Sequence, residues 1–148
     1  GWHGMSGGQY LDIEAEGKLL TLAELKMLHA AKTGALIKSA LEVGALCAEA
    51  DTTSTAYKAI SEFGAKIGLA FQIVDDILDV TQTSETLGKP AGSDEGLNKN
   101  TFPRLLGLDE SKNKAEDLLQ EAMALLEQNN LKTPLLEALA NRAVHRTF

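Results

Sequence analysis

One stretch decides the fold: Phe71-Gln72-Ile73-Val74-Asp75-Asp76-Ile77-Leu78-Asp79. On a helix, Asp79 lies four residues after Asp75 and three after Asp76, so the three acids share one face, with Gln72 one turn earlier. Like charges at this spacing destabilise an isolated helix, and a bound cation would offset their repulsion. Carboxylate oxygens suit Mg²⁺, which is usually held by one or two carboxylates together with substrate phosphates. The pattern predicts a Mg²⁺ site at Asp75, Asp76 and Asp79, with a solvated acidic patch as the alternative.

The acidic stretch ends a long predicted helix, from about residue 56 to about residue 81. Its apolar stripe recurs at helix spacing and consists of Ile60, Phe63, Ile67, Phe71, Val74 and Leu78. The preceding segment, residues 51–55, is polar and offers several candidate N-caps. Residues 83–100 are rich in Gly, Ser, Asp and Lys without apolar periodicity, which predicts a loop over the surface or over a ligand.

Helical patterns also fill the N-terminal part of the chain. A short helix is expected over Gln9–Glu16, ended by Gly17. Thr21 and Glu24 then form a capping-box pattern. It opens a helix expected from about residue 22 to about residue 49, whose apolar positions are Leu25, Leu28, Leu36, Ile37, Leu41 and Leu46. Gly34 and Gly44 inside it suggest close helix packing or a ligand near the backbone.

The C-terminal part is also helical by pattern. A short helix is expected to begin at Thr101-Phe102-Pro103 and to end by Gly107. Ser111 is predicted to cap a longer amphipathic helix that stops at Asn129-Asn130, and Thr133-Pro134 should start the last one. No stretch shows strand-like alternation, and no repeat or linker divides the chain. The sequence predicts one all-α domain over residues 1–148, a bundle of long helices.

Lysines complement the acidic face. Lys89 and Lys99 flank the glycine-rich loop, with Asp94 between them, and Lys32 lies in the helix that begins near Leu22. A diphosphate needs Mg²⁺ on some oxygens and ammonium groups on others. Each lysine alone is best explained as a surface charge, but together with the aspartates the set predicts a diphosphate site.

Composition excludes several classes of protein. The net charge of −7 argues against a nucleic-acid partner and against an anionic membrane surface. No apolar run approaches the roughly 20 residues that span a bilayer, and the chain does not open with a secretory signal. A single cysteine, Cys47, excludes an internal disulfide and suits a reducing compartment, so the expected location is the cytoplasm.

The chain resembles the trans-prenyl-diphosphate synthase family, and in particular its bacterial farnesyl diphosphate type. The matching stretches, in the family's order, are residues 4–12, His29 to Leu36, Gly68 to Gln72 followed by Asp75 to Asp79, Leu87 to Lys89, Gly92 to Asp94, and Lys99 to Pro103. Each piece alone is weak, but the joint match is specific. The resemblance implies an isoprenoid-synthase bundle, here only part of one.

The resemblance also implies a reaction. An allylic diphosphate, dimethylallyl or geranyl, ionises while Mg²⁺ holds its diphosphate between two aspartate-rich helices. The allylic cation alkylates isopentenyl diphosphate, and pyrophosphate accepts the released proton. The expected products are farnesyl diphosphate and pyrophosphate.

Roles follow from the resemblance by position. Asp75 is expected to bind Mg²⁺ directly, with Asp76 and Asp79 acting through water or by orienting lysines. The allylic diphosphate would be bound by Lys32 and Lys89, with Lys99 nearby.

Four further residues are given roles by the same resemblance. The Thr33 hydroxyl or carbonyl and the Gln72 side chain would face the developing cation, an electrostatic role. Gln9 and Asp12 would line the cavity wall. His29 is expected to be structural or on the surface.

Two elements of the family are absent from this sequence: the first aspartate-rich motif and the basic residues that bind isopentenyl diphosphate. We therefore expect this chain to correspond to the C-terminal half of a synthase and to be inactive alone. A half-bundle leaves apolar helix faces without partners, so we expect self-association, with a homodimer for the parent protein. Product length cannot be read, because the residues that set it precede the missing motif.

Three other functions remain open at this stage. A terpene cyclase or head-to-head condensing enzyme would share helices and aspartate-rich motifs. A non-catalytic regulatory subunit could keep the fold without the reaction. A purely structural bundle would need none of the acidic residues.

Overall fold

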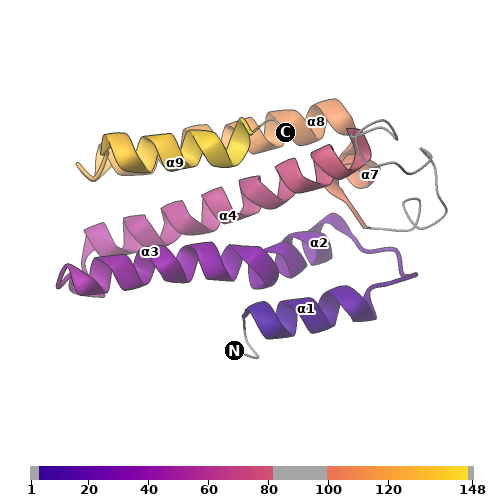
Figure 1. The fold of residues 1–148 in the computed structure, drawn as a ribbon, viewed down its shortest axis with the longest axis horizontal. Coiled ribbons are helices and arrows are strands. Elements are labelled where there is room, and N and C mark those ends of the chain that lie inside the picture. The colour runs from indigo at the N-terminus through magenta and orange to yellow at the C-terminus, as the bar shows by residue number, and fades with distance from the viewer. Residues whose placement is uncertain (1–3, 82–99, 147–148) are drawn as a thin grey trace.

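The computed structural model describes residues 4–81 and 100–146, which form helices without any strand among them (Figure 1). In chain order the elements are α1 (Met5–Glu14), α2 (Leu22–His29), the π-helical segment η1 (Ala30–Gly34), α3 (Ala35–Cys47), α4 (Thr55–Thr81), α7 (Phe102–Leu106), α8 (Leu108–Gln128) and α9 (Pro134–Val144). The all-α prediction is confirmed. None of the helices described is long and apolar enough to cross a membrane.

The longest helix, α4, is the centre of the bundle. It runs between α3 on one side and α8 with α9 on the other, and α1 lies beyond α2 and α3 (Figure 1). Its apolar stripe packs into two clusters. One joins α4 to α2, α7 and α8 through Leu25, Ala70, Ile73, Val74, Ile77, Phe102, Ala115 and Leu118. The other joins α4 to α8 and α9 through Phe63, Ile67, Leu119, Ala122, Leu126 and Ala140. Each large side chain in them contributes about 1.5–3 kcal/mol by burial, so α4 is what holds the layers together.

Most predicted helix ends are confirmed. The Thr21 hydroxyl accepts from the Glu24 N–H while the Glu24 carboxylate accepts from the Thr21 N–H, completing the capping box. Hydroxyl caps also open α7 at Thr101 and α9 at Thr133. Gly17, with φ of +73°, supplies the left-handed turn after α1.

The prediction that Ser111 caps the long C-terminal helix is wrong. That helix, α8, begins at Leu108, directly after Gly107, whose φ of +87° turns the chain. Ser111 lies one turn inside α8, fully buried, and its hydroxyl donates to the Gly107 carbonyl oxygen at 2.7 Å. The buried serine hydroxyl is therefore satisfied by back-bonding to the preceding turn and does not act as a cap.

Helix α1 begins earlier than the sequence predicts, at Met5, and includes Gly7 and Gly8. Both glycines are buried. A side chain at Gly8 would collide with the main chain of η1, because its Cβ would lie 2.5 Å from the backbone nitrogen of Lys32. Contact with η1 therefore favours a helical segment whose intrinsic helix propensity is low.

Close packing by glycine recurs between η1 and α4. A Cβ at Gly68 would lie 2.7 Å from the Gly34 Cα atom, so the two backbones touch there. Gly34 thus confirms the close-packing interpretation. Gly44 contradicts it, because nothing lies within 4 Å of the position its Cβ would take.

The apolar periodicity after Gly34 corresponds to burial only in part, since Leu41 is partly buried against the core. Helix α3 has no buried residue, and Leu36 is 58% exposed and Leu46 47% exposed. Large apolar side chains are also exposed on the neighbouring helices, at Met5, Tyr10, Leu11, Ile13 and Met27.

Candidate active site

A cavity of about 510 Å³ opens where α1 and α2 face the second half of α4. Its lining combines acids, one lysine, one histidine and an apolar wall: Asp12, Ala15, Glu16, Gly17, Leu20, Leu25, Leu28, His29, Lys32, Gln72, Asp75, Asp76, Asp79, Asn100 and Thr101. A lining that contains both charged groups and leucines suits a ligand with a charged head and a hydrocarbon tail.

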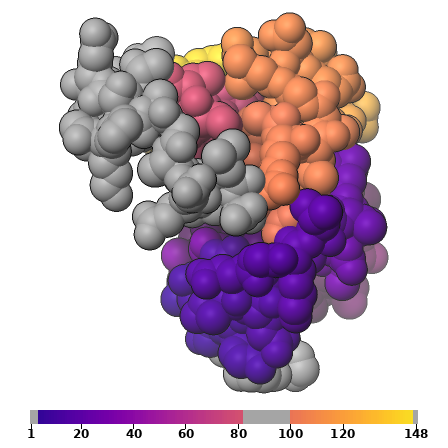
Figure 2. Space-filling view, turned by 90° about the vertical axis from the view of Figure 1, so that its right-hand side faces the viewer, coloured from indigo at the N-terminus to yellow at the C-terminus, as the bar shows by residue number. Residues whose placement is uncertain are grey.

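Asn100 closes one edge of the cavity. Its side-chain oxygen accepts from the Leu20 N–H at 3.0 Å, and its amide nitrogen donates to the carbonyl oxygens of Lys18 at 2.8 Å and Ala15 at 3.3 Å. Figure 2 views this end of the bundle, where α1 and the segment after it (indigo) touch the residues leading into α7 (orange). These three hydrogen bonds hold the turn between α1 and α2 against Asn100.

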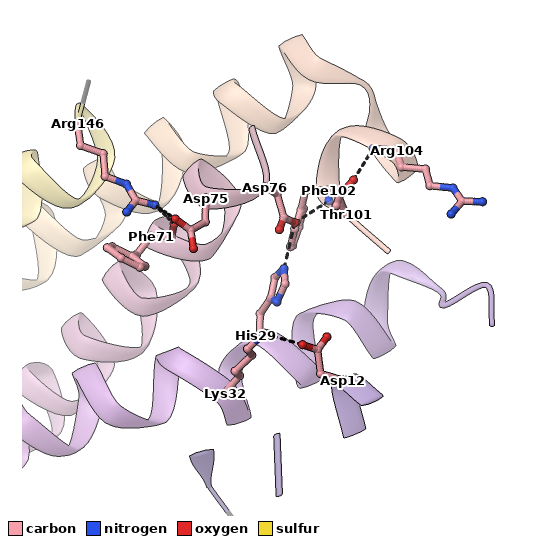
Figure 3. A network of polar contacts seen from close by, with 10 residues as sticks. All are labelled: Asp12, His29, Lys32, Phe71, Asp75, Asp76, Thr101, Phe102, Arg104 and Arg146. Atoms are coloured by element: carbon pink, nitrogen blue, oxygen red, sulfur yellow. Dashed lines mark hydrogen bonds and ion pairs between the residues drawn. The ribbon is translucent and has the colours of Figure 1, made fainter. Parts of the chain in front are cut away.

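Asp75 is paired with the other end of the chain. The Arg146 guanidinium donates to Asp75 Oδ1 and, at 3.1 Å, to the Phe71 carbonyl oxygen (Figure 3). The same guanidinium lies 3.9 Å from the centroid of the Phe71 ring, a cation–π contact. The Asp75 side chain is 50% exposed, so this carboxylate reaches both the arginine and the open cavity.

Asp76 is more buried, with a side chain that is 13% exposed. Its Oδ2 atom lies 3.1 Å from His29 Nε2 and accepts the Phe102 backbone N–H at 2.9 Å (Figure 3). His29 stacks on the Phe102 ring, with centroids 5.6 Å apart. One carboxylate oxygen therefore joins α2, α4 and the start of α7.

Lys32 extends from η1 toward the same cavity. Its Nζ donates to Asp12 Oδ2 on α1 at 2.6 Å (Figure 3). The lysine side chain is 31% exposed and that of Asp12 is 40% exposed. An ammonium group carries three N–H donors, so this bond orients Lys32 and leaves donors for a ligand.

Asp79 is exposed at the rim of the cavity. Within residues 4–81 and 100–146, no three His, Cys, Asp or Glu side chains converge as a ready-made metal cage. The donors that are present, carboxylate oxygens on one helix face, suit Mg²⁺ when ligand oxygens complete the coordination.

The structure brings together six of the predicted site residues, all in the cavity lining: Asp12, Lys32, Gln72, Asp75, Asp76 and Asp79. Gln72 is buried, at 6% exposure. Gln9 is exposed on α1, and Thr33 is partly buried in η1; neither is among the lining residues. Lys89 and Lys99 lie outside the described residues.

Sequence reasoning gave no site role to His29, Asn100 or Arg146. His29 lies three residues before Lys32, so helix spacing could have indicated it. Arg146 carries no such signal, since 71 residues separate it from its partner Asp75.

Known proteins match both the sequence and the fold. Residues 2–139 match the polyprenyl synthetase family. The chain is 47% identical to the farnesyl diphosphate synthase of Escherichia coli over 146 residues, which is 97% of this chain and 48% of that protein. The chain therefore spans about half the length of the curated relative it matches.

Two solved structures have the same helical arrangement. A putative farnesyl-diphosphate synthase from Marinomonas superimposes with a TM-score of 0.81 at 36% identity, over 97% of this chain and 48% of that one. The geranyltransferase of Helicobacter pylori, solved with magnesium and isoprenyl diphosphate, gives 0.74 at 38% identity, over 95% of this chain and 46% of that one. From the family match, the identities and the shared isoprenoid-synthase fold, we conclude that this chain belongs to the polyprenyl synthetase family.

Proposed function

We propose that this chain supplies the allylic-diphosphate side of a Mg²⁺-dependent prenyltransferase active site. The reaction joins an allylic diphosphate to isopentenyl diphosphate, with farnesyl diphosphate as the expected product. The observation that carries the proposal is a cavity whose lining includes Lys32 and the three aspartates of α4 together with Leu20, Leu25 and Leu28. One half of that lining suits a diphosphate and the other half suits a hydrocarbon chain.

Each residue is given the role that its chemical groups suit. Mg²⁺, when bound, would neutralise the diphosphate as it leaves. Among the three aspartates of α4, Asp75 and Asp79 are more exposed than Asp76 and are the proposed direct ligands, while Asp76 would act through water. Lys32, oriented by Asp12, would hold diphosphate oxygens with its remaining N–H donors.

The apolar side would exclude water from the reacting carbons. Leu20, Leu25 and Leu28 line it, and a carbocation near them would be sheltered from hydrolysis. The buried Gln72 amide supplies a dipole whose oxygen can face developing positive charge. No side chain is assigned as a strong base, since the departing pyrophosphate can take the proton.

The alternatives receive less support. The relatives named above are diphosphate synthases or prenyltransferases, which does not favour a terpene cyclase or a regulatory subunit. Cytoplasmic location and a homodimer stay proposals.

Reconstitution tests the function. The 148-residue chain is mixed with the N-terminal half of the Escherichia coli relative, and incorporation of labelled isopentenyl diphosphate is measured with geranyl diphosphate and Mg²⁺. We expect turnover by the mixture and none by either part alone. Asp75→Asn should reduce the rate by at least about 100-fold, a typical loss when transition-state charge is left unstabilised.

Asp117→Asn is the matched control, since Asp117 is exposed on α8 and does not line the cavity. Equal activity of Asp75→Asn and Asp117→Asn would refute the assignment. Conversion of the allylic diphosphate without use of isopentenyl diphosphate would indicate a cyclase. Sustained turnover by this chain alone would contradict the expected inactivity.

A further inference from the structure

His29 stands where three elements of the cavity meet. It is the last residue of α2, directly before η1, which carries Lys32. Its side chain is only 7% exposed. The ring packs on Phe102 at the start of α7 and contacts Asp76 on α4 (Figure 3).

The contact with Asp76 determines which ring nitrogen carries a proton. A carboxylate oxygen only accepts hydrogen bonds, so His29 Nε2 is the donor. The other nitrogen, Nδ1, is buried without a hydrogen-bond partner among the described residues. Such a group is unfavourable, and packing alone would favour an apolar residue at this position. The bond to Asp76 is therefore the interaction that explains a histidine here.

The bond has a consequence for Asp76. Both donors, His29 Nε2 and the Phe102 N–H, reach the same oxygen, Oδ2. Two donors from two elements fix the rotamer of the carboxylate. Asp76 lines the cavity, and its other oxygen, Oδ1, receives no hydrogen bond from the described residues.

We propose that His29 is a positioning residue: it holds the Asp76 carboxylate so that one oxygen serves the cavity, and it fixes the start of η1 against α4. Its effect on ligand binding rests on the proposed function, whereas the contact itself does not. The expected ligand is Mg²⁺ with a diphosphate, represented in the tests by inorganic pyrophosphate.

The chain contains a matched control. His145 Nε2 lies 2.9 Å from Glu116 Oε2, the same chemical pair, but the two side chains are 54% and 44% exposed. Neither residue lines the cavity. Any effect common to both histidines reflects an ordinary surface contact.

Nuclear magnetic resonance of the imidazole nitrogens in the whole chain tests the contact without a ligand. We expect the Nε2–H tautomer for His29, and exchange of that proton with water at least about tenfold slower than for His145. In Asp76→Ala the slow exchange should be lost. An Nδ1–H tautomer, or exchange as fast as that of His145, would overturn the proposal.

Calorimetric titration with Mg²⁺ and inorganic pyrophosphate tests the consequence. We expect His29→Leu to weaken binding by about tenfold, the lower end for loss of a partner behind a metal ligand. His29→Gln keeps an N–H donor and should bind within about threefold of the wild type, while His145→Leu should bind as the wild type does. Thermal melts of each variant check folding, and the glutamine variant keeps the comparison meaningful if the leucine variant unfolds.

Each result of the titrations either supports or refutes the proposed role of His29. Wild-type affinity in His29→Leu, or equal losses in the leucine and glutamine variants, would refute the donor role. If the wild type itself does not bind pyrophosphate, the proposed function fails for this chain. The imidazole spectrum then still decides whether His29 holds Asp76.

Discussion

Replacing Gly68 with alanine tests the close contact that sets Lys32 beside the aspartates of α4. The added Cβ would lie 2.7 Å from the Gly34 Cα atom and 3.3 Å from the Gly34 carbonyl oxygen. Both atoms belong to the main chain, so no side chain can move aside. Relief requires η1 to shift away from α4.

The magnitude follows from two opposing effects. Overpacking a close contact costs about 1–3 kcal/mol. Exchange of glycine for alanine inside a helix gains about 0.5–1 kcal/mol. The net change for Gly68→Ala is a loss of stability between about 0 and 2.5 kcal/mol, and a backbone clash favours the upper half of that range.

Gly44→Ala is the matched control. Gly44 also lies inside a helix, but nothing is within 4 Å of the added Cβ. This variant should be more stable than the wild type by about 0.5–1 kcal/mol. The gain is common to both variants, so their difference isolates the cost of the clash.

Urea denaturation followed by circular dichroism measures the difference, as a shift of midpoint at unchanged slope. The midpoint should fall for Gly68→Ala and rise for Gly44→Ala. If both midpoints rise equally, η1 and α4 are not in contact through Gly34 and Gly68, and the account of how Lys32 is placed is wrong.

Two further predictions concern the charged groups. Because Arg146 donates to Asp75 Oδ1, Mg²⁺ must compete with it, so Arg146→Gln should raise calorimetric affinity for Mg²⁺ with pyrophosphate by about fivefold, the equivalent of about 1 kcal/mol. Arg142→Gln, exposed on α9, is its control, and weaker binding in Arg146→Gln would mean that the arginine holds the diphosphate. The Thr21 backbone N–H and then its hydroxyl hold the pKa of Glu24 below its ordinary 4.5. The cap therefore contributes stability above that value, and the contribution is lost as the pH falls through the folded-state pKa. Urea midpoints at about pH 6 and about pH 3 should differ less in Glu24→Gln than in the wild type, and an unchanged pH dependence would contradict this.

Sequence patterns predicted what depends on local spacing. The aspartates of α4 share a face because residues three and four apart on a helix are neighbours. The capping box at Thr21 and the caps at Thr101 and Thr133 also depend on residues within one turn. These features need no knowledge of the rest of the fold.

What the sequence could not predict depends on packing between distant segments. Ser111 was predicted to begin the long helix, but the positive φ of Gly107 turns the chain so that α8 begins directly after the glycine. Gly34 and Gly44 look alike in sequence, and only the position of α4 distinguishes them. In the site, Arg146 contacts Asp75 although the two residues are 71 positions apart in the sequence. Helix periodicity relates only residues a few positions apart, so it could not predict this pair.

The π-helical segment has a consequence for the register of the chain. An α-helix advances about 100° per residue, and a π turn accommodates one residue more than an α turn. Deleting a single residue from Ala30–Gly34 would let α2 and α3 join as one regular helix. Because the π turn takes up the extra residue, α2 and α3 would keep nearly their present rotation relative to each other after the deletion. The change would be confined to η1, which carries Lys32 and the Gly34 that touches α4. The irregular turn therefore adjusts the local position of the lysine without changing the direction of the helices on either side.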